Sequence, residues 1–167
     1  FFGQLIAGPI MRGDEFLPQI HRIKNAKFQI RNIKYAAYFM FMGLFKKVVF
    51  ADNLSKMADT YFSQGVALGS LDSWIAAYLF AFQIYFDFSA YSEMAVGAGH
   101  LFGLDLNLNF KTPYLSKNPN EFWKRWHITL SSWIRDYIYI PLGGNSKGFK
   151  LQNLFLLIAM VLSGLWH

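Results

Sequence analysis

Two histidines in this sequence have the surroundings that proton-transfer chemistry needs. His127 lies in the stretch FWKRWHITLS, and His167 ends the uncharged run LQNLFLLIAMVLSGLW. An imidazole titrates near neutral pH, and removal from water favours its neutral form. A neutral imidazole can accept a proton from a hydroxyl, which is the work of a general base. Both residues are therefore candidate catalytic groups.

The residue pattern also allows a structural role for His127, because a single histidine on an apolar face is commonly hydrogen-bonded and inert. The other two histidines are weaker candidates. His21 lies in a polar, basic segment and is expected to be solvated, whereas His100 is expected to bond to a neighbouring helix. The chain has no cysteine and no His-x-x-x-His spacing, so no metal site is predicted.

A helix is expected to position His127. Asn118 and Pro119 suit the cap and the first position of a helix, and Glu121 suits the third position. We expect this helix to run from 119 toward Pro141, where PLGGN (141–145) predicts a helix stop and a turn. On a helical wheel, one apolar arc has His127 at its edge and Ser131 one turn further on. The tryptophans of this arc are Trp123, Trp126 and Trp133.

Two carboxylates stand in a span that supplies no cation. Asp87 and Glu93 belong to the stretch FDFSAYSEM, and residues 57–110 contain neither lysine nor arginine. An unpaired charge at depth is costly. We therefore expect structural ion pairs with cations from another helix, such as Arg125 or Arg135, rather than a catalytic role.

The composition is typical of a membrane protein. Apolar residues make up 54% of the chain and aromatic residues 19%, whereas charged residues reach only 16%, against about 25% in soluble domains. All cations fall within 12–56 or 111–150, which is typical of loops that flank membrane segments. The net charge of +6 therefore does not indicate a nucleic-acid-binding protein.

Several apolar stretches predict an all-α membrane bundle. The stretch 1–11, with its turn at Gly8-Pro9, suits a re-entrant or interfacial piece, and 12–34 suits a surface segment. Neither end of the sequence resembles a natural terminus, so 1–167 is expected to be one internal piece that lacks helices at both ends. The expected apolar helices are 33–52, 71–91, 94–104 and 151–166.

Four motifs together resemble the membrane-bound O-acyltransferase family, in the order in which that family has them. They are QLIAGPIMR, FDFSAYSEMAVG, PYLSKNPNEFWKRWHITLSSWIRDYIYIPLGGN and LSGLWH. The stretch YIPLGGN is similar to the branch that O-acetylates alginate. Small departures from the family pattern are Gly3, Ala90 and Thr129, where proline, glycine and serine are common.

The resemblance implies a multi-pass bundle with short, re-entrant and amphipathic helices around a catalytic tunnel. It implies that His127 and His167 are the active-site histidines and converge at a cavity. The general base would be His167, while His127 would orient or polarise the acyl thioester. Substrate-channel candidates beside them are Trp123, Trp126, Ser131 and Trp133, and the rings of the three tryptophans would exclude water.

The resemblance also implies substrates, partners and location. The donor would be a cytoplasmic acyl thioester such as acetyl-CoA, with no bound cofactor and no metal. The acceptor would be a hydroxyl of an exopolysaccharide such as alginate, reached directly or through an extracytoplasmic acyltransferase partner. The protein would lie among the lipids of a bacterial inner membrane, and no nucleic acid would take part.

Three alternatives remain open at this stage. The related branch that transfers D-alanine to teichoic acid shares FDFSAYS and the RWH region but usually lacks PLGGN. Buried histidines and acids would also suit a proton-coupled transporter or channel. A membrane scaffold without catalysis is the third alternative.

Overall fold

The computed structural model describes residues 8–23, 29–63 and 69–166, and these form two compact units, one up to Leu108 and one from Asn109. The described residues contain helices and no strand. The elements of the first unit are α1 (Gly13–Ile23), α2 (Ile30–Phe45), the π-helical η2 (Lys46–Ala51), α3 (Asp52–Phe62) and α4 (Ser70–Leu101). Those of the second are the 3₁₀ turn η3 (Pro113–Leu115), α5 (Pro119–Trp123), α6 (Ile128–Ile134), the π-helical η4 (Arg135–Tyr139), α7 (Ile140–Leu142) and α8 (Phe149–Trp166).

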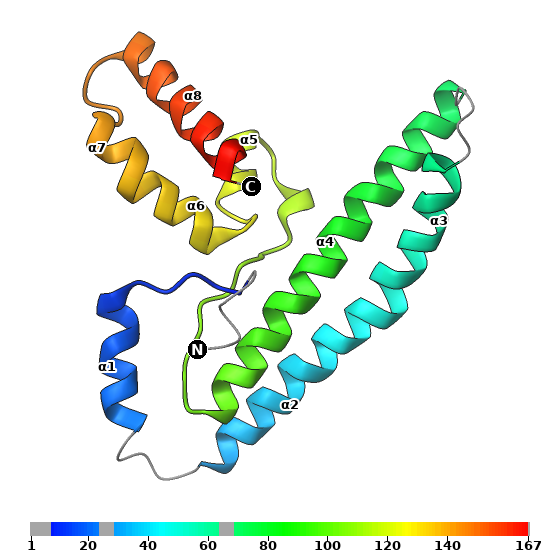
Figure 1. Cartoon of the computed structure of the whole chain (residues 1–167), viewed down its shortest axis with the longest axis vertical. Helices are drawn as coiled ribbons and strands as arrows, with labels where there is room; N and C mark the ends of the chain where they lie inside the picture. The colour runs from blue at the N-terminus through cyan, green and yellow to red at the C-terminus, as the bar shows by residue number, and fades with distance from the viewer. Residues whose placement is uncertain (1–7, 24–28, 64–68, 167) are drawn as a thin grey trace. The chain divides into compact units, whose positions relative to one another are not determined.

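A long helical hairpin forms most of the first unit. The continuous run α2–η2–α3 lies alongside α4 and antiparallel to it (Figure 1). The expected helices 71–91 and 94–104 are one continuous helix of 32 residues, so the predicted break between them is wrong. The glycines of 94–104 lower helix propensity, but their close packing against α2 and the following loop stabilises the helix through them.

The hairpin closes through the same pattern of small residues on both helices. Alanine, methionine and glycine follow one another at intervals of four and three residues in each helix. A Cβ atom on Gly43 would lie 2.7 Å from the Ala90 carbonyl oxygen, and one on Gly97 would lie 3.0 Å from the Ala36 carbonyl oxygen. The two helix backbones therefore approach closely at these points. The residues of the pattern are Ala36, Met40 and Gly43 on α2, and Ala90, Met94 and Gly97 on α4.

Ion pairs join η2 to α4 beside this contact. The Lys46 ammonium pairs with the Glu93 carboxylate, and Lys47 Nζ lies 2.6 Å from Asp87 Oδ1 and 3.0 Å from Asp52 Oδ1. Both lysines lie outside 57–110, as expected. They bond to α4 because the hairpin places the start of η2 beside the two carboxylates.

The arginines suggested as partners of these carboxylates were the wrong choice. Arg125 Nη2 lies 2.5 Å from Glu121 Oε1, and Arg135 Nε lies 2.6 Å from Asp136 Oδ1. Each arginine finds a carboxylate one helical turn or one residue away, so neither needs a distant partner.

Two hydrogen bonds join helix α1 to the loop that follows α4. Gln19 Nε2 donates to the Asp105 carbonyl oxygen (3.2 Å), and the Asp105 N–H donates to Gln19 Oε1 (2.8 Å). The His100 ring stacks on Phe39 of α2 at a centroid distance of 5.8 Å, and its Nδ1 lies 3.4 Å from Asp105 Oδ1 in the loop after α4. Val96, Leu104 and Leu106 form a small hydrophobic core in this unit. The partly buried residues packed against it are Met11, Phe16, Ile23 and Phe39.

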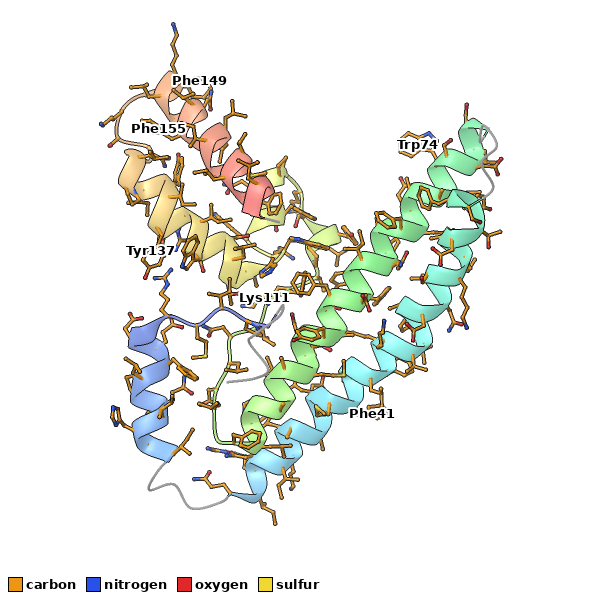
Figure 2. The ribbon with its side chains drawn as sticks, in the orientation of Figure 1. Phe41, Trp74, Lys111, Tyr137, Phe149 and Phe155 are labelled. Carbon is orange, nitrogen blue, oxygen red and sulfur yellow. The ribbon has the colours of Figure 1, made fainter. Side chains whose placement is uncertain are left out.

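In the second unit, a turn reverses the chain between α7 and α8. Helix α7 ends at Leu142, which confirms the helix stop predicted for PLGGN. Gly143 and Gly144 have φ of 128° and 51°, a conformation that favours glycine. A Cβ on Gly143 would lie 2.9 Å from the ring of Phe155, so glycine also lets α8 pack closely (Figure 2).

Large apolar side chains are exposed on both units. Phe41 and Trp74 of the hairpin are more than half exposed, as is Phe149 at the start of α8 (Figure 2). No helix within the described ranges combines the length and the apolar character that crossing a membrane requires.

Replacing Ala36 by leucine is expected to destabilise the full-length protein by about 1–3 kcal/mol, because the larger side chain would overpack the contact with Gly97. Ala36 is only 1% exposed. The same substitution at the exposed neighbour Ala37 is the matched control and should change stability little. Thermal unfolding of both variants measures the difference. Equal unfolding midpoints would contradict a close α2–α4 contact.

Candidate active site

The start of α5 confirms the capping residues predicted from the sequence. Asn118 Oδ1 accepts a hydrogen bond from the Glu121 N–H (2.9 Å), and Pro119 occupies the first helical turn. Glu121 Oε2 accepts from the Lys117 N–H (2.9 Å), one residue before the expected Asn118. This hydrogen bond, and then the positive charge of Arg125, hold the pKa of Glu121 below its ordinary value.

The helix expected from 119 toward Pro141 is interrupted at the histidine. Helix α5 ends at Trp123, and α6 begins at Ile128. His127 has φ 42° and ψ 56°, which is left-handed backbone that a right-handed helix cannot include. A helical wheel drawn through 119–141 therefore does not describe which residues share a face on the two sides of this break. His127 occupies the N-cap position of α6 and does not lie at the edge of one continuous apolar arc.

The imidazole of His127 lies in an aromatic environment. His127 is 8% exposed, and the centroid of the Phe110 ring lies 6.5 Å from its own. Trp126 packs edge-on against Phe110 (5.1 Å) and stacks on Phe122 (5.6 Å). Tyr114 extends this cluster at 6.1 Å from Trp126. The side chain that the resemblance makes catalytic is therefore withdrawn from water.

The structure separates the four channel candidates. Trp126 belongs to the aromatic cluster beside His127, and Ser131 Oγ donates to the Trp126 carbonyl oxygen (3.1 Å). Trp123 contacts Phe122 at a centroid distance of 5.4 Å and is partly exposed. Trp133 stacks on Tyr137 (5.3 Å), and it is also partly exposed.

An irregular segment, 109–111, that the sequence did not single out flanks the histidine. The Lys111 N–H donates to the Arg125 carbonyl oxygen (3.0 Å), and the Ile128 N–H donates to the Asn109 carbonyl oxygen (2.9 Å). Asn109 is 1% exposed, so an amide side chain is buried next to the site. Asparagine is usually exposed, and no periodicity in LNLNF marks this one as buried. Only the fold brings it to residues that follow His127.

The second candidate, His167, lies outside the described residues, so its convergence with His127 stays a prediction. Asp87 and Glu93 belong to the first unit, where both are engaged by lysines of η2. Their ion pairs agree with the structural role expected for them.

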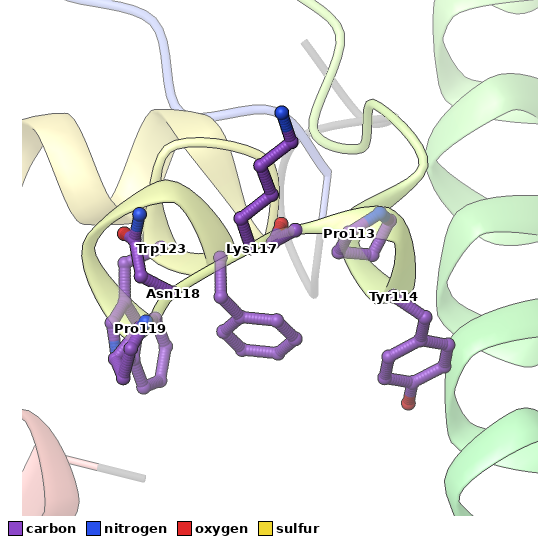
Figure 3. Close-up of a pocket in the computed structure, with 8 residues that line it drawn as sticks. Pro113, Tyr114, Lys117, Asn118, Pro119 and Trp123 are labelled. Atoms are coloured by element: carbon purple, nitrogen blue, oxygen red, sulfur yellow. The ribbon is translucent and has the colours of Figure 1, made fainter.

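A cavity of about 490 Å³ opens beside α5 (Figure 3). Aromatic side chains and a cation share its wall, because Tyr114, Phe122 and Trp123 come together there with Lys117. The Ser116 hydroxyl is buried at this position. The remaining lining residues are Pro113, Asn118 and Pro119.

The described residues form helices, with a buried histidine at a helix break, and comparison with known proteins assigns the class. The model of the membrane-bound O-acyltransferase family matches residues 1–167. The chain belongs to this family.

Three relatives illustrate its range. The chain is 42% identical over 167 residues to "Peptidoglycan O-acetyltransferase" of Helicobacter pylori, covering 100% of this chain and 32% of the relative. It is 45% identical to "Probable alginate O-acetylase AlgI" of Pseudomonas aeruginosa, over 99% of this chain and 31% of the relative. It is 30% identical to "Teichoic acid D-alanyltransferase" of Streptococcus thermophilus, over 100% of this chain and 43% of the relative. The chain thus spans about a third of the length of the two acetyltransferase relatives.

Acid is expected to loosen the start of α5. Because the pKa of Glu121 is lowered in the folded protein, its stabilising effect is present above the ordinary carboxyl pKa of about 4.3 and is lost as the pH falls through the lowered value. Hydrogen-exchange protection of the Lys117 amide should therefore fall once the pH drops through this lowered pKa. Glu121→Gln keeps an acceptor oxygen that does not titrate, so its protection should not change in this window. If protection of the Lys117 amide in the wild-type protein does not change with pH, the hydrogen bond to the Glu121 carboxylate is contradicted.

Glycine at position 127 is expected to give a more stable protein than alanine, by about 1 kcal/mol, because left-handed backbone strains any residue with a Cβ. Both changes remove the same imidazole contacts, so the difference between them reports the backbone alone. Lys124, with φ −75°, is the matched control, and there the order should reverse. Chemical unfolding of the four full-length variants measures both differences. Equal free energies of unfolding for His127→Ala and His127→Gly would contradict left-handed backbone at this position.

Proposed function

We propose that the full-length protein transfers an acetyl group from a cytoplasmic thioester, acetyl-CoA, to hydroxyl groups of a cell-surface polysaccharide such as alginate. The observation that carries this proposal is His127, a buried imidazole that stands at a helix break in the motif RWH. Acetyltransferase relatives at 42–45% identity support acetyl transfer over D-alanyl transfer, whose relatives are 27–30% identical.

The reaction needs one general base and one group that holds the thioester. His167 takes the proton from the acceptor hydroxyl, whose oxygen attacks the thioester carbonyl carbon. The carbon–oxygen bond forms, the carbon–sulfur bond breaks, and the proton passes to the departing thiol. His127 orients the thioester carbonyl and stabilises charge that develops on its oxygen. Neither a bound cofactor nor a metal is needed for these steps.

Water must be kept from the thioester, since hydrolysis would waste the acyl group. The rings of Phe110, Phe122 and Trp126 are suited to this task because they pack on one another next to His127. Trp123 and Trp133 are partly exposed in the second unit and would line the approach of a substrate.

The membrane setting of the proposal rests on the family and on the exposed apolar side chains. We place the full-length protein in a bacterial inner membrane, as a bundle of several spans with a tunnel between its two sides. Donor and acceptor then approach from opposite sides. An extracytoplasmic partner protein passes the acyl group on to the polysaccharide where direct transfer does not occur.

His167→Ala is expected to lower acetyl transfer by about 10²- to 10⁴-fold per folded molecule, because it removes the general base. His127→Ala should show a smaller loss if it only positions the thioester. His21→Ala, at an exposed position of α1, is the control and should keep wild-type activity. The assay uses full-length protein in proteoliposomes with labelled acetyl-CoA, and with alginate or peptidoglycan fragments as acceptors. A melting curve for each variant gives the folded fraction.

The same assay separates the rival functions. Label on the acceptor supports acetyl transfer, whereas label transfer seen only with D-alanyl thioester and teichoic acid would support the other branch. Solute or proton flux without label transfer would support a transporter. Wild-type specific activity in a stable His167→Ala protein would remove that residue as the base.

A further inference from the structure

The first turn of α6 takes its capping groups from a residue far away in the sequence. A helix begins with N–H groups that have no partner within the helix, and the N-cap side chain commonly accepts from one of them. His127 occupies the N-cap position of α6, yet its side chain makes no capping hydrogen bond there. The cap must therefore be supplied by another part of the chain.

Asn109 supplies it with both its backbone and its side chain. Its carbonyl oxygen accepts from the Ile128 N–H (2.9 Å), and its Oδ1 accepts from the Thr129 N–H (3.3 Å). The Thr129 hydroxyl donates to the same Oδ1 at 2.6 Å. Asn109 and Thr129 are 1% and 5% exposed, so water does not compete for these bonds. Buried hydrogen bonds of this kind hold a geometry firmly.

The same segment holds the strained backbone of the histidine from both sides. Left-handed backbone at a non-glycine residue persists only where its surroundings enforce it. On one side of His127, the Arg125 carbonyl oxygen is bonded to the Lys111 N–H, and on the other side Ile128 is bonded to Asn109. Residues 109–111 therefore bracket His127, with Asn109 at the side where α6 begins.

We propose that Asn109 is a positioning residue, which caps α6 in place of His127 and thereby directs the imidazole toward the thioester. The inference rests on the proposed function, in which His127 acts on the donor. Without Asn109 Oδ1, the Thr129 N–H loses this acceptor, and a side chain at the N-cap position is the usual group to accept from it. An imidazole that turns to accept this hydrogen bond points away from the reacting carbonyl.

The test compares full-length variants that keep or remove the cap. Asn109→Ala should lower kcat for acetyl transfer about 100-fold, because small errors in position cost rates of that order, while KM for acetyl-CoA changes little. Thr129→Val should lower kcat in the same direction, whereas Thr129→Ser, which keeps the hydroxyl, should retain wild-type kcat. Asn120→Ala is the matched control, since this asparagine is exposed on α5.

A fifth variant reports a positioning role that loss of stability cannot imitate. Asn109→Asp keeps an acceptor oxygen for the Thr129 N–H and hydroxyl, so it should retain kcat per folded molecule even where the buried charge lowers stability. A mere packing role would lower the amount of folded protein in Asn109→Ala and Asn109→Asp alike and leave kcat per folded molecule unchanged in both.

The outcomes distinguish the two proposals. If the wild-type protein transfers no acyl group to any acceptor, the proposed function fails. If the wild type is active and Asn109→Ala keeps its kcat per folded molecule, the positioning role is wrong. It is equally wrong if Thr129→Ser loses as much activity as Thr129→Val, or if Asn109→Asp loses as much kcat per folded molecule as Asn109→Ala.

Discussion

The left-handed backbone at His127 is the constraint on which the candidate site depends. Helix α5 ends at Trp123, and His127, in left-handed backbone, stands directly before α6 with its imidazole buried. Such a conformation costs free energy, so neighbouring groups must hold it. The irregular segment 109–111 does so through backbone hydrogen bonds before and after the histidine. The aromatic rings of Phe110 and Trp126 then enclose the same region.

The first unit depends on a different constraint, the close approach of two helix backbones. Gly43 and Gly97 permit it, because any side chain there would meet a carbonyl oxygen of the opposite helix. Once the helices are this close, Lys46 and Lys47 lie within reach of Glu93 and Asp87. Dispersion contacts over a long interface and paired charges beside it therefore reinforce each other. The continuity of α4 through its glycines follows from the same packing.

Local signals in the sequence predicted local structure well. The Asn118-Pro119 start of α5 and the Gly143-Gly144 stop after α7 are confirmed, because each depends on hydrogen bonds and backbone preferences within a few residues. Two predictions about where helices are continuous and where they break were wrong. The expected helix from 119 toward Pro141 has a break that hydrophobic periodicity does not reveal, and the expected break after residue 91 does not exist.

The sequence by itself determined the family, the helical class and the identity of His127 as a candidate, because motifs and composition are properties of the chain alone. It also predicted that Asp87 and Glu93 pair with cations from outside 57–110, since that apolar span contains no lysine or arginine. Only the tertiary structure decided that these partners are lysines of η2, and that Asn109 caps α6 beside His127. Contacts between residues 20 or more positions apart depend on how the chain turns between them, and no local preference encodes that path.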